Sequence, residues 1–212
     1  MLKVNEIYYS LQGESTYAGL PCVFVRLTYC NLRCSYCDTE YAFYEGKDMS
    51  VSDIIKKVES YDCNLVEVTG GEPLFQEESI DLMKKLCDAG YEVMLETGGH
   101  MSVENVDERV KIIMDVKTPS SKMSKKNLFS NFEKLKNSDE LKFVIGTRED
   151  YEWSKSVLEQ YSLTDKFTVL FSSVYGKLSN KDLAEWIIED KLKVRFQLQN
   201  HKYIWEPDSR GV

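Results

Sequence analysis

The sequence has no run of about 18 apolar residues, which is the length that a membrane-spanning helix needs. Its first residues, MLKVNEIYYSLQGE, also lack the basic segment, apolar core and small-residue cleavage site of a secretory signal. We therefore expect a cytoplasmic protein that does not bind a membrane. No internal repeat, low-complexity tract or linker-like shift in composition divides the 212 residues. We expect residues 1–212 to form a single domain.

Positive charge is also scarce, because 27 lysines and arginines stand against 35 aspartates and glutamates, which leaves a net charge of −8. An acidic surface argues against a broad contact with a phosphate backbone, so we expect no nucleic-acid partner. The most basic stretch, residues 118–138, is interpreted as a solvated loop with a short helix.

What the sequence does contain is a series of short segments rich in β-branched and aromatic residues. Nearly continuous apolar segments of this kind predict strands of a parallel sheet that is buried on both faces. The predicted strands are 22–28, 65–69, 91–97, 111–116, 141–145, 166–171 and 193–199.

Helical patterns lie between these strands. Apolar residues recur at helical spacing over 51–58 and 80–87, and Thr147 with Asp150 and Ser179 with Asp182 each resemble the start of a further helix. Alternating strands and helices indicate βαβ units. A closed eightfold barrel takes about 250 residues, so we expect an α/β fold with about six or seven strands. Pattern alone leaves open an incomplete barrel or an open doubly wound sheet.

Glycines and polar residues follow five of the predicted strands. Parallel α/β folds bind their ligands at the carboxyl ends of the strands, so a run of such loops indicates a binding site at this rim. The loops are the cysteine-containing segment after 22–28, Gly70–Pro73, Thr97–His100, Lys117–Ser121 and Asn200–Lys202.

Three of the six cysteines, Cys30, Cys34 and Cys37, form a C-x3-C-x2-C motif. A disulfide is disfavoured because the number is odd and the compartment is expected to be reducing. A structural zinc ion takes four ligands, and the chain offers only two histidines. An iron–sulfur cube held by three thiolates would keep one iron open for a substrate or cofactor. The remaining cysteines, Cys22, Cys63 and Cys87, occur singly and are interpreted as structural.

These motifs resemble those of the radical S-adenosylmethionine (SAM) superfamily. An aromatic residue, Tyr36, precedes the last cysteine, and the sequence GGEP at Gly70–Pro73 matches a superfamily element that contacts the methionine amine of SAM. The resemblance implies that Cys30, Cys34 and Cys37 hold a [4Fe–4S] cluster whose fourth iron binds SAM. It also favours the partial, TIM-like barrel of that superfamily.

Further motifs, spread over almost the whole chain, resemble the 7-carboxy-7-deazaguanine synthase family. They are SLQGEST (10–16), CDT (37–39), TGGEP (69–73), ETGG (96–99), DVKTPSS (115–121) and QNHKYIW (199–205). Ser15 departs from the family pattern, which has glycine there. The resemblance implies conversion of 6-carboxy-5,6,7,8-tetrahydropterin to 7-carboxy-7-deazaguanine with release of ammonia, in 7-deazapurine and queuosine biosynthesis. It also implies Mg²⁺, a reducing partner such as flavodoxin or ferredoxin, and a homodimer.

The same resemblance implies a role for individual residues, while the cluster and SAM carry the chemistry in place of a catalytic side chain. Arg26 suits the pterin carboxylate because a guanidinium binds a carboxylate through two parallel hydrogen bonds. Thr39 would bind Mg²⁺ through its hydroxyl, since Mg²⁺ prefers oxygen ligands. The implied substrate contacts are Leu11, Gln12, Gly13, Glu14, Arg26 and Thr69, and the implied SAM contacts are Tyr36, Gly71, Glu72, Lys117 and Ser120.

Two alternatives stay open. One is a different radical SAM enzyme, such as an activase that makes a glycyl radical on a protein partner, although the pairing of Arg26 with Thr39 argues against it. The other is a zinc-binding module built from Cys30, Cys34, Cys37 and His100, which leaves the GGEP motif and the rest of the rim unexplained.

Overall fold

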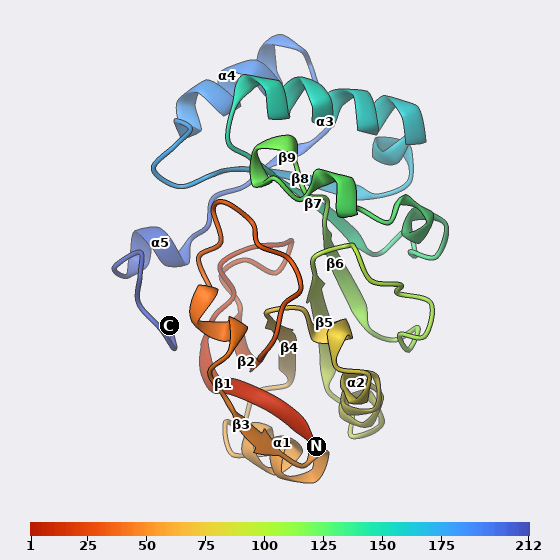
Figure 1. The fold of residues 1–212 in the computed structure, drawn as a ribbon, viewed down its shortest axis with the longest axis vertical. Coiled ribbons are helices and arrows are strands. Elements are labelled where there is room, and N and C mark those ends of the chain that lie inside the picture. The colour runs from red at the N-terminus through yellow and green to blue at the C-terminus, as the bar shows by residue number, and fades with distance from the viewer.

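The structure, a computed structural model that describes residues 1–212, is built on one curved sheet of nine strands (Figure 1). Its strand order is β3-β1-β2-β4-β5-β6-β7-β8-β9, so β3 and β9 remain as free edges and the barrel does not close. The strands are β1 Leu2–Leu11, β2 Pro21–Leu27, β3 Lys47–Met49, β4 Leu65–Gly70, β5 Glu92–Thr97, β6 Lys111–Asp115, β7 Glu140–Ile145, β8 Thr168–Ser173 and β9 Arg195–Phe196.

All seven predicted strands are present, and each pairing from β2 through β9 is parallel. The expectation of a partial barrel is thereby confirmed. The last predicted strand is much shorter than expected, because only Arg195–Phe196 pairs with β8. The sequence analysis missed β1 and β3, which pair antiparallel at the other edge. Strand β1 mixes polar and apolar residues because its central part is only half buried, so it lacks the continuous apolar run used to find the others.

Five helices accompany the sheet: α1 Val51–Glu59, α2 Glu78–Asp88, α3 Arg148–Tyr161, α4 Asn180–Glu189 and α5 His201–Ile204. Both helix starts suggested by the sequence are confirmed. Thr147 and Asp150 form a reciprocal capping box at α3, and the side chain of Ser179 accepts from the backbone at α4. None of these helices has the length and apolar character needed to cross a membrane.

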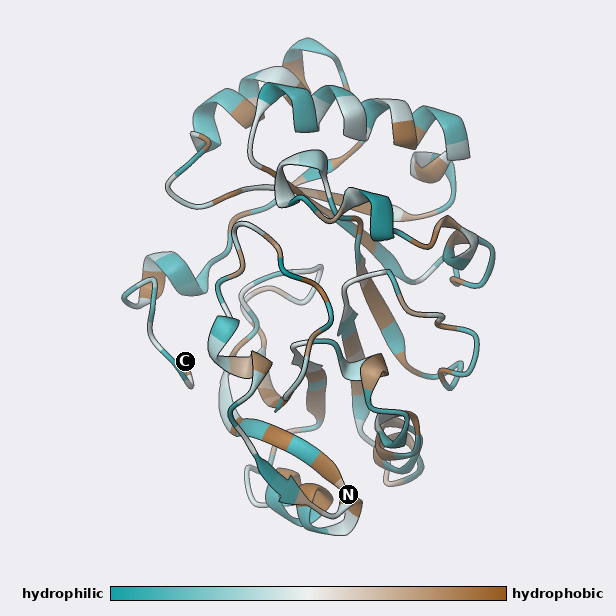
Figure 2. Ribbon diagram, in the orientation of Figure 1, coloured by the Kyte–Doolittle hydropathy of each residue, from teal (hydrophilic) through white to brown (hydrophobic).

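Alternate residues of each strand face opposite sides of the sheet. Val66 and Val68 of β4 join the main core, which lies between the sheet and the apolar faces of helices such as α1 and α2. Leu65 of the same strand belongs instead to a small apolar cluster inside the barrel. The strands carry most of the hydrophobic colour in Figure 2, whereas the helices show it only in part.

The basic stretch 118–138 forms the expected loop with short helical turns, at Pro119–Ser121, Ser124–Lys126 and Phe129–Glu133. It is not wholly solvated, because Phe132 and Leu135 are buried in the main core.

Candidate active site

A pocket of about 450 Å³ opens at the carboxyl ends of the parallel strands. The location agrees with the rim predicted from the glycine and polar loops. All but one of the predicted site residues line this pocket, and the exception is Ser120. Its hydroxyl and backbone N–H both bond to Asp150 of α3, with an N–H···O distance of 2.8 Å, so Ser120 ties a loop to a helix.

A layer of polar side chains crosses the inside of the barrel, with one residue from each of five adjacent strands. Parallel register sets Arg26 beside Thr69 and Asp115 beside Lys142. Between these pairs, the Thr69 hydroxyl donates to Glu96 Oε2 at 3.0 Å. We call these five residues the polar layer: Arg26, Thr69, Glu96, Asp115 and Lys142.

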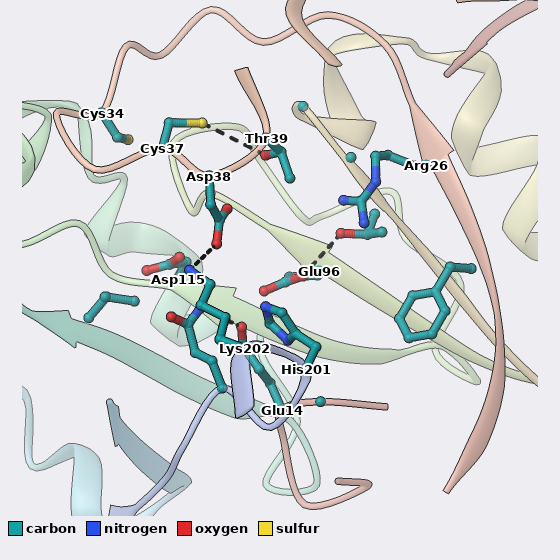
Figure 3. A pocket seen from close by; sticks show the side chains of 18 of the residues that line it. Glu14, Arg26, Cys34, Cys37, Asp38, Thr39, Glu96, Asp115, His201 and Lys202 are labelled. Atoms are coloured by element: carbon teal, nitrogen blue, oxygen red, sulfur yellow. Dashed lines mark hydrogen bonds and ion pairs between the residues drawn. The ribbon is translucent and has the colours of Figure 1, made fainter. Parts of the chain in front are cut away.

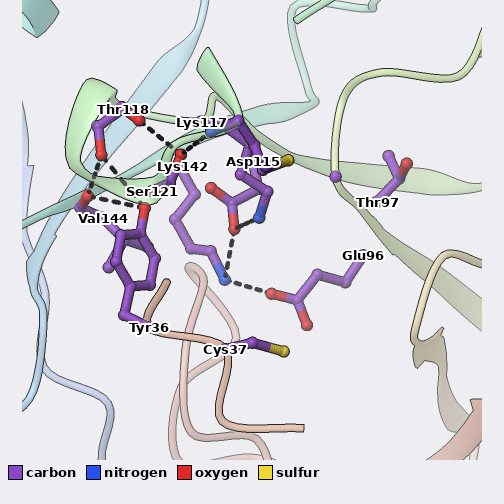
Figure 4. A network of polar contacts seen from close by, with 12 residues as sticks. Tyr36, Cys37, Glu96, Thr97, Asp115, Lys117, Thr118, Ser121, Lys142 and Val144 are labelled. Atoms are coloured by element: carbon purple, nitrogen blue, oxygen red, sulfur yellow. Dashed lines mark hydrogen bonds and ion pairs between the residues drawn. The ribbon is translucent and has the colours of Figure 1, made fainter. Parts of the chain in front are cut away.

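Lys142 is the central cation of this layer. Its ammonium contacts Glu14 at 2.8 Å. It also contacts Glu96, and Asp115 at 3.8 Å (Figure 4). Burial lowers the pKa of Lys142, but these three carboxylates outweigh burial and raise it well above its usual value. The sequence analysis did not single out Lys142, Glu96 or Asp115. The signal was present, since each is a charged residue beside buried apolar residues of the same strand.

The three cysteines lie on the loop after β2 and line the pocket as free thiols. Burial raises the pKa of the Cys34 thiol to about 11 and also raises that of Cys30, so their thiolates need a cationic partner. Gly71 lets the GGEP turn approach this loop closely, because a Cβ at Gly71 would lie 2.1 Å from the Tyr29 carbonyl oxygen. The residues therefore fit the iron–sulfur cluster that the motif implies.

Tyr36 and Glu72, two of the predicted SAM contacts, are fixed by the protein itself. The Tyr36 hydroxyl lies 3.2 Å from that of Thr118 and donates to the Val144 carbonyl oxygen at 3.4 Å. Glu72 is fully buried, and its carboxylate accepts from the Thr97 hydroxyl and the Gly98 N–H, both at 2.8 Å. Both side chains thus hold the cysteine loop and neighbouring strand ends in place.

Lys117 and Asp115 form a pair at the same wall, with 2.8 Å between the ammonium and Oδ2. The other carboxylate oxygen, Asp115 Oδ1, is buried and has no hydrogen-bond partner. A buried acceptor without a partner is costly, so a ligand that donates a hydrogen bond here would be stabilised.

His100 does not join the cysteines. Its Nε2 lies 2.5 Å from Asn31 Oδ1, and its Nδ1 lies 3.5 Å from Glu72. Burial lowers the pKa of His100 to about 4, so the ring is neutral. No three His, Cys, Asp or Glu side chains converge as they would around a single metal ion, which counts against the zinc alternative. Thiolates of an iron–sulfur cube bind different irons and need not converge in this way.

Arg26 projects from β2 between two tyrosines, with its guanidinium carbon 5.8 Å from the Tyr8 ring centre and 5.9 Å from that of Tyr41. Its Nε–H donates to Glu6 at 2.8 Å and its Nη2 to the Tyr8 hydroxyl at 2.7 Å. The remaining Nη1 has no partner within the protein, so Arg26 is oriented and still able to bind an anion.

The C-terminal segment supplies pocket residues to which the sequence analysis gave no role. Gln199 donates to Glu14 Oε1 at 2.9 Å. Lys202 pairs with Asp38 at 2.6 Å (Figure 3). His201 lies against Gly13, where a Cβ would be 2.5 Å from the histidine Nδ1. These residues close one side of the pocket over the segment that follows β1.

Ser15, where the family pattern has glycine, adopts a left-handed backbone conformation with φ of 64°. Glycine reaches this region without steric cost, which explains the family preference. Here the Ser15 hydroxyl accepts a hydrogen bond from the Tyr17 N–H at 3.1 Å, which partly offsets the strain.

Known proteins share this fold. The family model for the radical SAM superfamily matches residues 25–185. The crystal structure of QueE from Escherichia coli superposes with a TM-score of 0.79 at 21% identity and covers 94% of each chain. The crystal structure of SuiB from Streptococcus suis, bound to S-adenosylmethionine, gives a TM-score of 0.53 over 80% of this chain. The fold and the cysteine loop thus define a radical SAM protein.

Full-length relatives narrow the assignment. The chain is 46% identical to 7-carboxy-7-deazaguanine synthase of Chlorobaculum tepidum, over 100% of this chain and 97% of that protein. It is 44% identical to the enzyme of the same name from Koribacter versatilis, over the full length of both. The chain belongs to the 7-carboxy-7-deazaguanine synthase family.

Proposed function

We propose that this protein converts 6-carboxy-5,6,7,8-tetrahydropterin to 7-carboxy-7-deazaguanine, with release of ammonia, for 7-deazapurine and queuosine biosynthesis. The observation that carries the proposal is a single cavity lined by Cys30, Cys34 and Cys37 together with Arg26 and Thr39. Such a cavity can hold an iron–sulfur cofactor beside a small anionic substrate. The expected homodimer stays a prediction.

The protein's own residues bind and orient the reactants. Arg26, held by Glu6 and Tyr8, binds the substrate carboxylate. The unpartnered oxygen of Asp115 accepts a hydrogen bond from a ligand at the opposite wall. The [4Fe–4S] cluster and SAM, when bound, supply the one-electron chemistry that starts the rearrangement.

The decisive experiment is anaerobic incubation of the reconstituted protein with SAM, Mg²⁺ and the pterin, followed by mass analysis. We expect 7-carboxy-7-deazaguanine and an equal amount of ammonia. An activase would release no ammonia from the pterin, so its absence from an enzyme that binds cluster and SAM would favour that alternative.

We propose that Thr39 is the protein's Mg²⁺ ligand. Its hydroxyl lies 3.7 Å from the sulfur of Cys37 and lines the pocket (Figure 3). Thr39→Ala should retain the cluster and SAM binding but lose most of the stimulation by Mg²⁺, because a methyl group cannot replace an oxygen donor. Thr39→Ser should retain more, since the oxygen survives. Titration of Mg²⁺ against turnover checks this, and an unchanged response in Thr39→Ala would overturn the metal assignment.

We also propose a docking surface for the reducing partner, a protein of the flavodoxin or ferredoxin class. Five exposed cations around the cysteine loop have no ion-pair partner, although the protein as a whole is acidic. We call them the rim cations. Ser35, on the cysteine loop, bonds to the carbonyl oxygens of Ser120 and Ser121 at 2.6 and 3.1 Å, which brings the lysines of the next turn beside the loop. The rim cations are Arg33, Lys122, Lys125, Lys126 and Lys177.

Charge reversal tests this surface. Lys125→Glu with Lys126→Glu should raise the KM for reduced flavodoxin by about tenfold and weaken the salt dependence, because an acidic partner loses electrostatic attraction. Turnover driven by dithionite, which needs no docking, should not change. Lys166→Glu with Lys193→Glu is the matched control, since both lysines are exposed and unpaired at the amino ends of β8 and β9. Equal effects of both double variants would contradict a local docking site.

A further inference from the structure

Glu67 is a buried carboxyl group in the pocket that none of the family motifs includes. It lies on β4 two residues before Thr69, on the same face of the strand, and is only 4% exposed. Its neighbours in register are Phe24 on β2 and Met94 on β5, both part of the apolar cluster inside the barrel. Glu67 therefore sits one layer below the polar layer, among apolar side chains, and still lines the pocket.

A chain of hydrogen bonds connects Glu67 to the segment after β1. The Gln12 side-chain N–H donates to Glu67 Oε2, and the Gln12 side-chain oxygen accepts from the backbone N–H of Glu14 at 3.1 Å. Gln12 is itself 4% exposed, and both its side-chain nitrogen and its side-chain oxygen have a partner within the protein. Gln12, which the family resemblance places at the substrate, thus has its side chain engaged by Glu67.

Glu67 has no ion-pair partner, although several ionisable groups lie near it. Lys142 is committed to Glu14, Glu96 and Asp115. Burial, followed by repulsion from Glu96, raises the pKa of Glu67 to about 8. An isolated carboxylate among apolar groups is expensive, whereas a neutral acid still accepts from Gln12. The ionisable groups that face it are Tyr8 from β1, Cys22 from β2, Glu96 from β5, Lys142 from β7 and Glu14.

We propose that Glu67 is a positioning residue of the substrate site: as a neutral carboxylic acid, it holds the Gln12 amide and so fixes the Gln12–Glu14 segment beside the bound pterin. The inference rests on the proposed function for the identity of the substrate. The second oxygen, Oε1, makes no hydrogen bond within the protein and carries the acid proton.

Two substitutions test whether Glu67 acts as a neutral acid. They distinguish this role from that of an anion and from a purely structural role. Glu67→Gln keeps an oxygen that accepts from Gln12 and should leave the KM for the pterin within about twofold of the wild type. Glu67→Met fills the space but leaves the Gln12 N–H unpartnered, and it should raise this KM about tenfold with a smaller change in kcat. SAM affinity, measured by equilibrium binding to the holoenzyme, should be the same in both.

The pH dependence gives a signature that a structural role would not produce. Above about pH 8 the wild-type KM should rise, because ionised Glu67 adds a negative charge near Glu14 and Glu96 in a pocket that takes an anionic substrate, whereas that of Glu67→Gln should stay level. Equal losses of affinity in Glu67→Gln and Glu67→Met would overturn the proposal.

Unfolding tests the protonation state without turnover. The folded state keeps the Glu67 proton up to about pH 8, while the unfolded chain releases it near pH 4.5. Wild-type stability therefore falls as the pH rises between these values, and Glu67→Gln lacks this loss. The ratio of their unfolding equilibrium constants should grow by up to about tenfold per unit between about pH 6 and 8. Glu189→Gln, at an exposed position, is the control and should show a constant ratio.

The proposed function and the role of Glu67 can be contradicted independently of each other. A wild-type holoenzyme that makes no product from the pterin would remove the proposed function and leave the unfolding result standing. A constant unfolding ratio for Glu67→Gln, in an enzyme that turns over the pterin, would remove the neutral acid alone.

Discussion

Replacing Cys30, Cys34 or Cys37 by alanine should abolish both the iron–sulfur cluster and the activity. Each thiol lies on the loop after β2 and faces the pocket, and two thiolates hold a cube poorly. Anaerobically purified variants should lack the brown colour of the wild type, and iron and acid-labile sulfide assays should show its loss. One zinc ion per chain and no sulfide in the wild type would instead restore the zinc alternative.

The other three cysteines supply a matched control. Cys22 and Cys63 lie in or against the apolar cluster inside the barrel, and Cys87 is buried on α2. Alanine at any of them removes a small buried or half-buried group at a modest cost in stability. We expect full cluster content in all three variants. A cluster lost with any of them would show that the ligands have been assigned wrongly.

Replacing Lys142 by methionine should have the largest effect on stability. The substitution keeps much of the side-chain volume but leaves Glu14, Glu96 and Asp115 without their shared cation. Removing one partner from a buried ion pair typically costs about 3–5 kcal/mol, because the remaining charge stays buried and uncompensated. Urea unfolding of the anaerobic protein measures this loss. Lys155→Met, which removes a cation at the surface, should cost at most about 1 kcal/mol.

The pH dependence of this loss follows from the two pKa shifts. Burial raises the pKa of Glu14, but Lys142 and further partners outweigh it and hold the pKa below its usual value. The stability that Glu14 gains is thus present above about pH 4.5 and is lost on acidification through its folded pKa. The raised pKa of Lys142 keeps its contribution intact up to about pH 10. The gap between wild type and Lys142→Met should persist over about pH 6–9, and a gap that vanishes in this range would contradict the assigned charges.

Motifs in the sequence identified most of the pocket before the fold was known, but they could not give each side chain its contacts. Gln12 and Ser120 show the difference. Both carry over from the family as ligand contacts, yet the Gln12 amide is engaged by Glu67 and Glu14, and the Ser120 hydroxyl by Asp150. A motif records which residue types recur together, whereas the partner of a polar atom depends on groups that are remote in the chain.

Seven parallel strands and the three cysteines followed from the sequence by itself. Nearly continuous apolar runs such as 22–28 predict burial on both faces, and three thiols within eight residues need no folding to come together. Only the tertiary structure decided the antiparallel edge formed by β1 and β3 and the layer in which Lys142 meets Glu14, 128 residues away. The pattern of apolar and polar residues along a strand indicates which of its faces are buried. Register between strands sets which charged side chains share the barrel interior, and it arises from pairings between distant segments that no local pattern encodes.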